Sequence, residues 1–349
     1  MKKMLWFSFG IFFLLGISTA SFSWQYFDFI NTPVNITPEN AQFEILPGST
    51  INQVATQLQQ QGIITHPTWF VWYAKYRDQA ESLKAGEYQI TPGSKPADLL
   101  DQFVSGRVMQ HTLRIGEGWT FADVMQAVST HPTLVQTLPS KHPRVVAQML
   151  GIRNGHPEGW FFPETYSFPK GTTDIAFLQR AYRIMQITLD REWMQRSNNL
   201  PYKTPYEALI MASIIEKETG LSVEHAQVGG VFTRRLKIGM RLQADPTVVY
   251  GLGDQYQDQL TRTNLDTPTP YNTYTIKGLP PTPIAMPSLA AIRAALHPAP
   301  GDALYFVATG DGGHQFSATL AEHNVAVAKY REWEAQQKLL EQQEAQYGR

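Results

Sequence analysis

The 349-residue sequence contains no cysteine, which excludes disulfide bonds, zinc sites built on thiolates and a cysteine nucleophile. It also lacks a basic excess, because 29 Lys and Arg residues stand against 30 Asp and Glu residues, for a formal net charge of −1. Binding to the phosphate backbone of nucleic acid needs a basic surface, so we expect no nucleic-acid partner.

Several catalytic signatures are absent as well. The sequence holds no HExxH, Gly-x-Ser-x-Gly, P-loop or dinucleotide-binding fingerprint. His314 and His323 do not have the spacing of metal ligands, and we expect neither a metal nor a cofactor. What is present is a globular composition, with 43% apolar and 17% charged residues, in a chain long enough for two domains.

The N-terminus carries one long apolar run. Lys2 and Lys3 precede residues 4–24, which no Asp, Glu, Lys or Arg interrupts. About 20 such residues span a bilayer, whereas a cleaved signal peptide has an apolar core of about 7–15 residues. The length favours a transmembrane anchor over residues 1–24, while Ser18-Thr19-Ala20 keeps a cleaved signal open. The two lysines predict a cytoplasmic N-terminus, with the rest of the chain outside the inner membrane in the periplasm.

After a predicted linker over residues 25–40, a turn-and-helix pattern recurs. "ILPGSTINQVATQL" and "ITPGSKPADLLDQF" share an apolar end, Pro-Gly-Ser and an amphipathic helix. Gly permits the turn and Ser can cap the helix that follows. Residues 41–108 then form a strand-helix-helix-strand unit that resembles a LysM-type module, which binds N-acetylglucosamine polymers. A generic βααβ spacer remains the alternative.

The rest of the chain mixes helices and short strands without a regular βαβ period. We expect one α+β domain over residues 109–335 and a charged, solvated helical tail over residues 336–349. The predicted fold class of the whole chain is therefore α+β.

The stretch "ASIIEKETG" places two carboxylates at the end of an apolar helix. Residues two apart on a helix point about 200° away from each other. Glu218 falls on the stripe of Met211, Ile214 and Ile215, where loss of hydration raises the pKa of a carboxylic acid and suits it to donate a proton. Glu216 falls on a smaller face and is expected to make a structural hydrogen bond or salt bridge. The alternative is that both are solvated surface glutamates.

Five segments in fixed order carry a resemblance to a known family. They read "EGWFFPETY", "MASIIEKET", "GMRLQADPTVVYG", "YNTYTIKGLPP" and "GGHQFSATLAEHN". Together they resemble the endolytic murein transglycosylases, the MltG or YceG-like family. The sequence departs from the family at Arg234, Thr282 and Ser288, where the family usually has Asn, Gly and Gly.

The resemblance implies a membrane protein that cuts glycan strands of nascent peptidoglycan, terminating their elongation. Glu218 would be the catalytic acid, leaving 1,6-anhydro-N-acetylmuramic acid ends. Gln243, Asp245, Asn272 and Tyr274 are candidates for lining the substrate groove, and peptidoglycan synthases are candidate partners. Two alternatives stay open: a lysozyme-type muramidase with Asp245 as second carboxylate, and a non-catalytic peptidoglycan-binding scaffold for synthases.

The aromatic residues of "EGWFFPETYSF" permit two interpretations. Flat aromatic faces with polar edges suit sugar rings, but aromatic residues at this density are more often part of a core.

Overall fold

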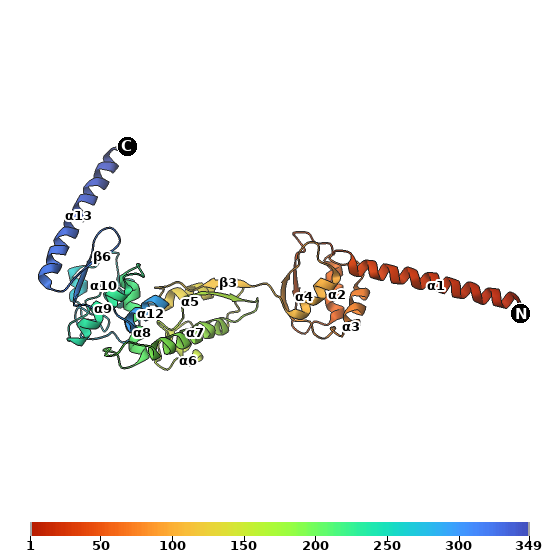
Figure 1. The fold of residues 1–349 in the computed structure, drawn as a ribbon, viewed down its shortest axis with the longest axis horizontal. Helices are drawn as coiled ribbons and strands as arrows, with labels where there is room; N and C mark the ends of the chain where they lie inside the picture. Colours follow the sequence, from red (N-terminus) through yellow and green to blue (C-terminus); the bar gives the residue numbers. More distant parts are fainter. Residues whose placement is uncertain (1, 348–349) are drawn as a thin grey trace. The chain divides into compact units, whose positions relative to one another are not determined.

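A computed structural model describes residues 2–347, with side chains from residue 16 to residue 344 (Figure 1). The chain divides into two compact units, which we describe separately. Unit 1 comprises Met1–His111 and Ser167–Thr172, and unit 2 comprises Thr112–Tyr166 and Thr173–Arg349. Helices and two-stranded sheets occur together, so the α+β prediction is confirmed.

Unit 1 begins with the long helix α1 (Lys2–Asn31). The helix continues into the segment predicted as a linker, and that prediction is corrected for residues 25–31. The physical reason is packing, because Phe29 of α1 is buried and its ring lies 5.6 Å from the ring of Trp69.

The predicted anchor lies partly outside the described residues. It covers residues 1–24, and the side chains of residues 1–15 are not described. Within the described part of the chain, no helix is long and apolar enough to cross a membrane.

The small module of unit 1 has the predicted order of elements. It consists of β1 (Gln42–Ile45), α2 (Ile51–Gln60), α3 (Pro67–Tyr76), β2 (Gly86–Gln89) and a further helix, α4 (Pro96–Ser105). The strands pair antiparallel, with Phe43 opposite Tyr88. Both side chains are fully buried and pack on Phe103 of α4, at ring distances of 5.5 and 4.8 Å. The capping box of Thr50 and Gln53 begins α2, because each side chain satisfies the other's backbone N–H.

Unit 2 is mainly helical. Its helices are α5 (Phe121–Thr130), α6 (Pro143–Leu150), α7 (Asp174–Met194), α8 (Pro205–Glu218), α9 (His225–Lys237), α10 (Asp245–Leu252), η1 (Gly253–Gln255), α11 (Arg262–Asp266), α12 (Leu289–Leu296) and α13 (Leu320–Tyr347). The strands β3 (His111–Arg114) and β4 (Thr165–Phe168) form one sheet. In another, β5 (Tyr305–Ala308) pairs antiparallel with β6 (His314–Ser317).

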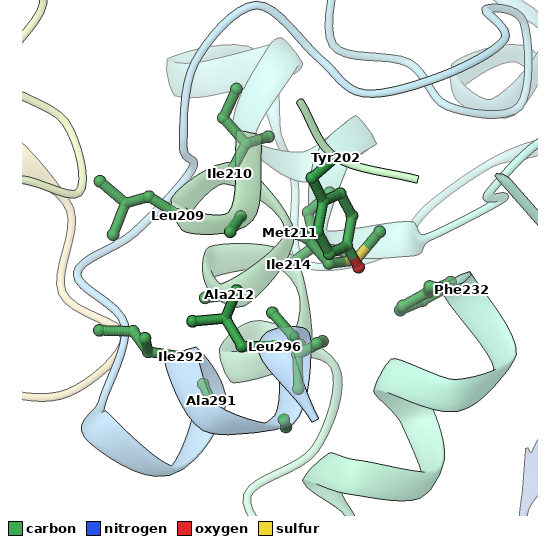
Figure 2. Packing of buried hydrophobic residues seen from close by; sticks show 14 of the residues in the cluster. Tyr202, Leu209, Ile210, Met211, Ala212, Ile214, Phe232, Ala291, Ile292 and Leu296 are labelled. Atoms are coloured by element: carbon green, nitrogen blue, oxygen red, sulfur yellow. The ribbon is translucent and has the colours of Figure 1, made fainter. Parts of the chain in front are cut away.

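Helix α8 is the centre of unit 2. It packs against α7, α9, α10 and α12, and Figure 2 shows Met211 and Ile214 of α8 among side chains of α9 and α12. Every residue from Ala208 to Ile215 is buried. A helix that is apolar on all sides is stable only when neighbours surround it. The rigid core therefore fixes the direction in which the last turn of α8 points.

Helices α9 and α12 approach each other closely at Gly229. A Cβ atom at this position would lie 2.6 Å from the carbonyl oxygen of Ala294. Only glycine fits without a backbone shift, so the sequence specifies this crossing.

Candidate active site

The last turn of α8 presents the two glutamates. The side chain of Thr204 accepts a hydrogen bond from the backbone N–H of Glu207 at 3.2 Å and Pro205 occupies the first turn, which begins the helix. The helix ends at Glu218, and Thr219 is already extended, with φ −142°. The chain therefore leaves the core at Glu218.

Glu218 has the environment of a general acid. Its Oε2 atom is buried and has no hydrogen-bond partner among the described residues. Burial, as the main cause, and the negative charge of Asp245 together raise the pKa of Glu218 to about 8, while Arg235 acts in the opposite direction. The carboxyl is therefore protonated near neutral pH and has an oxygen free to donate that proton.

Glu216 has a structural role, as predicted. Its Oε2 atom accepts hydrogen bonds from the backbone N–H and the hydroxyl of Ser288, at 2.9 and 2.5 Å. The Ser288 hydroxyl oxygen in turn accepts from the N–H of Ala291 and caps α12. This explains Ser288, one of the departures from the family pattern, since a glycine could not provide that hydroxyl.

Arg235 is a functional candidate that the sequence reasoning missed. It is buried on α9, where its guanidinium donates to the carbonyl oxygens of Leu304 and Leu242 at 2.7 and 2.5 Å. It also lies over the ring of Tyr305, 5.4 Å from its centroid. Those contacts hold one positive charge beside Glu218. The sequence did carry one indication of its burial, because Arg235 follows Val228 by seven residues and so lies on the same apolar face of α9.

Arg234 explains a second departure from the family pattern. Its Nε and one terminal nitrogen donate to the carbonyl oxygens of Ala303 and Ala299, at 2.7 and 3.0 Å. The side chain therefore secures the segment between α12 and β5, away from the acid.

Two predicted groove residues, Asp245 and Tyr274, meet near Glu218. Asp245 is the first residue of α10, and its Oδ1 accepts a hydrogen bond of 2.5 Å from the hydroxyl of Tyr274. The charges of Glu218 and Asp245 both raise the pKa of Tyr274, after burial as the main cause. Glu218, Asp245 and Tyr274 therefore form one electrostatic cluster, together with Arg235.

The turn before Asp245 is held in an unusual conformation. Gln243 has φ 52°, a left-handed backbone that costs a non-glycine residue on the order of 1 kcal/mol. Its N–H donates to the carbonyl oxygen of Thr273 at 3.2 Å, and the Thr273 hydroxyl accepts from the N–H of Ala244 at 2.9 Å. These bonds hold the turn against the loop that carries Tyr274. Gln243 itself is exposed at the surface.

Asn272 does not line a groove in this structure, which corrects its predicted position. The residue is fully buried, and its amide donates to the carbonyl oxygens of Asn264, Leu265 and Thr267, at 3.3, 3.0 and 2.7 Å. Its Oδ1 accepts from the N–H of Tyr274 at 2.9 Å. The buried side chain of Asn272 therefore holds the loop backbone in place and orients Tyr274.

A groove of about 450 Å³ runs past Asp245, a volume within the usual range of ligand sites. Its lining combines polar and aromatic residues with apolar ones. The lining residues are Thr120, Lys217, Asp245, Pro246, Val249, Tyr250, Tyr256, Asp258, Gln259, Leu260 and Ile284. Such a mixture can contact both the hydroxyl groups and the apolar C–H faces of sugar rings.

The aromatic motif belongs mainly to the core. Phe161, Tyr166 and Phe168 are buried, while Trp160 stacks on Tyr206 at a ring distance of 5.8 Å. The core interpretation of this motif is therefore confirmed.

Glu158 opens the same motif and is buried beneath the groove. Its oxygens accept from the N–H of Phe121 at 2.9 Å and from the hydroxyl of Tyr250 at 3.0 Å. Burial raises the pKa of Glu158 to about 7. Glu158 fixes Tyr250, which lines the groove.

The two C-terminal histidines make contacts within the fold. His314 donates its backbone N–H to one oxygen of Glu224 at 2.8 Å and pairs through Nδ1 with the other at 2.6 Å. His323 stacks on Tyr305 at 5.2 Å. Among the side chains that the structure describes, no three from His, Asp or Glu are arranged to hold a metal ion.

Comparison with known proteins identifies the family. The sequence profile of the YceG-like family matches residues 43–329. The chain belongs to the YceG-like family. The YceG-like relatives include the endolytic murein transglycosylase of Bacillus subtilis (strain 168), 31% identical over 300 residues, which cover 81% of this chain and 82% of the relative.

Two further proteins are similar to this chain over most of its length. The endolytic murein transglycosylase of Streptococcus pneumoniae serotype 2 is 29% identical over 368 residues, covering 93% of this chain and 64% of the relative. The crystal structure of a YceG-like protein from Listeria monocytogenes superposes with a TM-score of 0.52 at 31% identity, and the match covers 81% of this chain and 97% of that one.

Proposed function

We propose that this YceG-like protein is a peptidoglycan lytic transglycosylase that cleaves glycan strands internally, at the bond between N-acetylmuramic acid and N-acetylglucosamine. The observation that carries the proposal is Glu218, a buried carboxyl with a raised pKa and one free oxygen at the end of a rigid helix. The names of the relatives from B. subtilis and S. pneumoniae support the substrate class.

In the proposed reaction one carboxyl group serves twice. Glu218 donates its proton to the bridging glycosidic oxygen, and the bond from that oxygen to C1 of the muramoyl ring breaks. The C6 hydroxyl oxygen of the same ring then bonds to C1, and its proton passes to the Glu218 carboxylate. The product is a 1,6-anhydro ring, no water is consumed, and Glu218 is again protonated.

The neighbours of Glu218 have distinct proposed roles. Positive charge develops at C1 as the bond breaks, and the carboxylate of Asp245 supplies nearby negative charge. Tyr274 holds Asp245 through its 2.5 Å hydrogen bond. The groove beside Asp245 positions the strand so that the C6 hydroxyl lies near C1, which supplies a large part of the rate. Gln243, exposed on the adjoining turn, is a further candidate contact with the strand.

Localisation at the membrane is part of the proposal. The uninterrupted apolar run over residues 4–24 behind two lysines supports a single-pass anchor in the inner membrane, with the module of unit 1 and the whole of unit 2 in the periplasm. Synthases that make nascent strands at the same membrane are the proposed partners. Cleavage there would end strand elongation.

The test is digestion of purified glycan strands, followed by mass spectrometry of the new ends. We expect anhydro-muramoyl ends, which are lighter than reducing ends by one water. Reducing ends alone would instead favour a muramidase, in which Asp245 is the second carboxylate. Intact strands, together with binding of the strands to the protein, would favour a non-catalytic scaffold.

A further inference from the structure

Unit 1 exposes a patch of large aromatic side chains at the junction of α1 and α3. On α1, Phe27 is 64% exposed, and on α3, Tyr76 is 86% exposed. Phe22 and Trp72 are also exposed. Soluble surfaces seldom gather so many aromatic residues at one place, and such a patch marks an interaction site.

The patch is a built surface in which the two helices are packed together. The ring of Phe22 lies 6.1 Å from Trp69 and 5.9 Å from Trp72, and Tyr26 lies 6.3 Å from Trp69. Phe29, one turn further along α1, is buried in the core of the module. Since α1 enters that core, the module is rigidly attached to the end of the helix.

A groove of about 500 Å³ lies within the patch, and the side chains that line it include no Asp, Glu, Lys or Arg in the described part of the chain. It is formed by one side of α1, which includes Phe22, Tyr26 and Phe27, and by Trp72 and Tyr76 of α3.

Another side of α1 carries Gln25, Asp28 and Thr32, which line a separate groove together with Phe29 and with Ile63 and Trp69 of the module. That groove is mixed in character, whereas, among the described residues, the side of α1 that lines the groove within the patch carries no charged side chain.

The position of the patch along α1 identifies its partner. A helix rises about 1.5 Å per residue and the hydrocarbon core of a bilayer is about 30 Å thick. If the apolar run begins to cross the membrane after Lys3, residues 22–24 lie at the far hydrocarbon boundary. Trp and Tyr concentrate at this level, because their rings prefer the interface and their polar atoms reach water.

We propose that the aromatic patch lies in the headgroup region of the outer leaflet, so that α3 rests on the lipid surface and fixes the orientation of the module. This inference rests on the proposed membrane anchor and adds a second contact with the bilayer. The module would then be held close to the membrane, where new glycan strands emerge, and would not extend freely away from it.

The absence of cysteine allows a direct test with single labels. Full-length variants Tyr76→Cys and Gln89→Cys, each with an environment-sensitive fluorophore, are reconstituted into vesicles of phosphatidylethanolamine and phosphatidylglycerol. Tyr76 belongs to the patch, and Gln89 is an exposed residue of β2 outside it. A Phe12→Cys label within the apolar run reports the anchor. Quenching is measured with nitroxide lipids labelled at the headgroup or deep in the acyl chain.

We expect the fluorophore at residue 76 to show blue-shifted emission that headgroup nitroxides quench. The fluorophore at residue 89 should not be quenched, and the one at residue 12 should be quenched by the nitroxide deep in the acyl chain. A label at residue 76 that behaves like the one at residue 89, while residue 12 is quenched, would overturn the proposal and leave the anchor intact. Loss of quenching at residue 12 as well would refute the anchor itself. A shift at residue 76 caused by glycan strands in lipid-free detergent would reassign the patch to sugar binding.

Discussion

Replacing Glu218 with Gln should make the protein more stable at alkaline pH, although the same change removes its activity. The pKa of Glu218 is about 8 in the folded protein, against an ordinary value of 4.5. Between these pH values the carboxyl is protonated when folded and ionised when unfolded. Unfolding then releases a proton, so the stability of the wild type falls as the pH rises through this window.

The size of the effect follows from the same pKa values. The difference between 4.5 and about 8 corresponds, at about 1.36 kcal/mol for each pKa unit, to about 5 kcal/mol. Gln does not titrate, so the variant does not lose this stability. Between pH 4.5 and pH 8, the free energy of unfolding of the variant should therefore rise relative to that of the wild type by up to about this amount. Above pH 8 the difference should be constant.

Urea unfolding of both proteins at pH 5, 7 and 9 measures this difference. The matched control is Glu216→Gln, which removes a carboxylate two residues away that is satisfied by Ser288. The control should be less stable than the wild type at neutral pH. If the difference in unfolding free energy between the wild type and Glu218→Gln does not change with pH, Glu218 is ionised at neutral pH. That result would refute the assignment of a buried acid.

Five further predictions concern activity and localisation. Glu218→Gln should lose anhydro product by a factor of about 10²–10⁴, and wild-type activity should decline above pH about 8 as the acid ionises, which a pH–rate profile checks. Glu216→Gln should keep its activity while losing about 1.5–3 kcal/mol of stability, since it weakens hydrogen bonds to a charged group, and assays well below its melting temperature, beside urea unfolding, separate the two effects. Tyr274→Phe should lower kcat/KM about tenfold with little change in melting temperature, because it frees the Asp245 carboxylate, and unchanged kinetics would remove Tyr274 from the site. Deleting residues 41–108 should weaken cleavage of long strands more than cleavage of short ones if the module binds glycan, and equal losses would indicate a spacer. The mature protein should keep its N-terminus, and an N-terminal sequence that begins near Ser21 would contradict the anchor.

The buried environment of Glu218 could be predicted from the sequence because it is set largely by one helix. Met211, Ile214 and Ile215 lie on the face that also carries Glu218, and the spacing alone separates Glu218 from Glu216. The strand-helix-helix-strand order of the module could also be predicted, because turn and cap residues such as Thr50 act locally.

The rest of the site depends on contacts between distant segments. Arg235 lies beside Glu218 only because the carbonyl oxygens of Leu304 and Leu242 accept its hydrogen bonds, and no local pattern encodes that arrangement. Asn272 carries the donors and acceptors expected of a sugar contact, yet the loop uses them for its own backbone. A sequence shows which polar groups exist, and only the fold decides which of them remain free.

The central claim is that Glu218 cleaves the strand without adding water, and digestion in water enriched in oxygen-18 tests it most directly. Purified glycan strands are cut by the wild-type protein in labelled water, and the new muramoyl ends are analysed by mass spectrometry. The proposed mechanism predicts anhydro ends that contain no oxygen-18, because the oxygen that bonds to C1 is the C6 oxygen of the same ring. Muramoyl ends that carry oxygen-18 would contradict it, since they would show that water attacked C1.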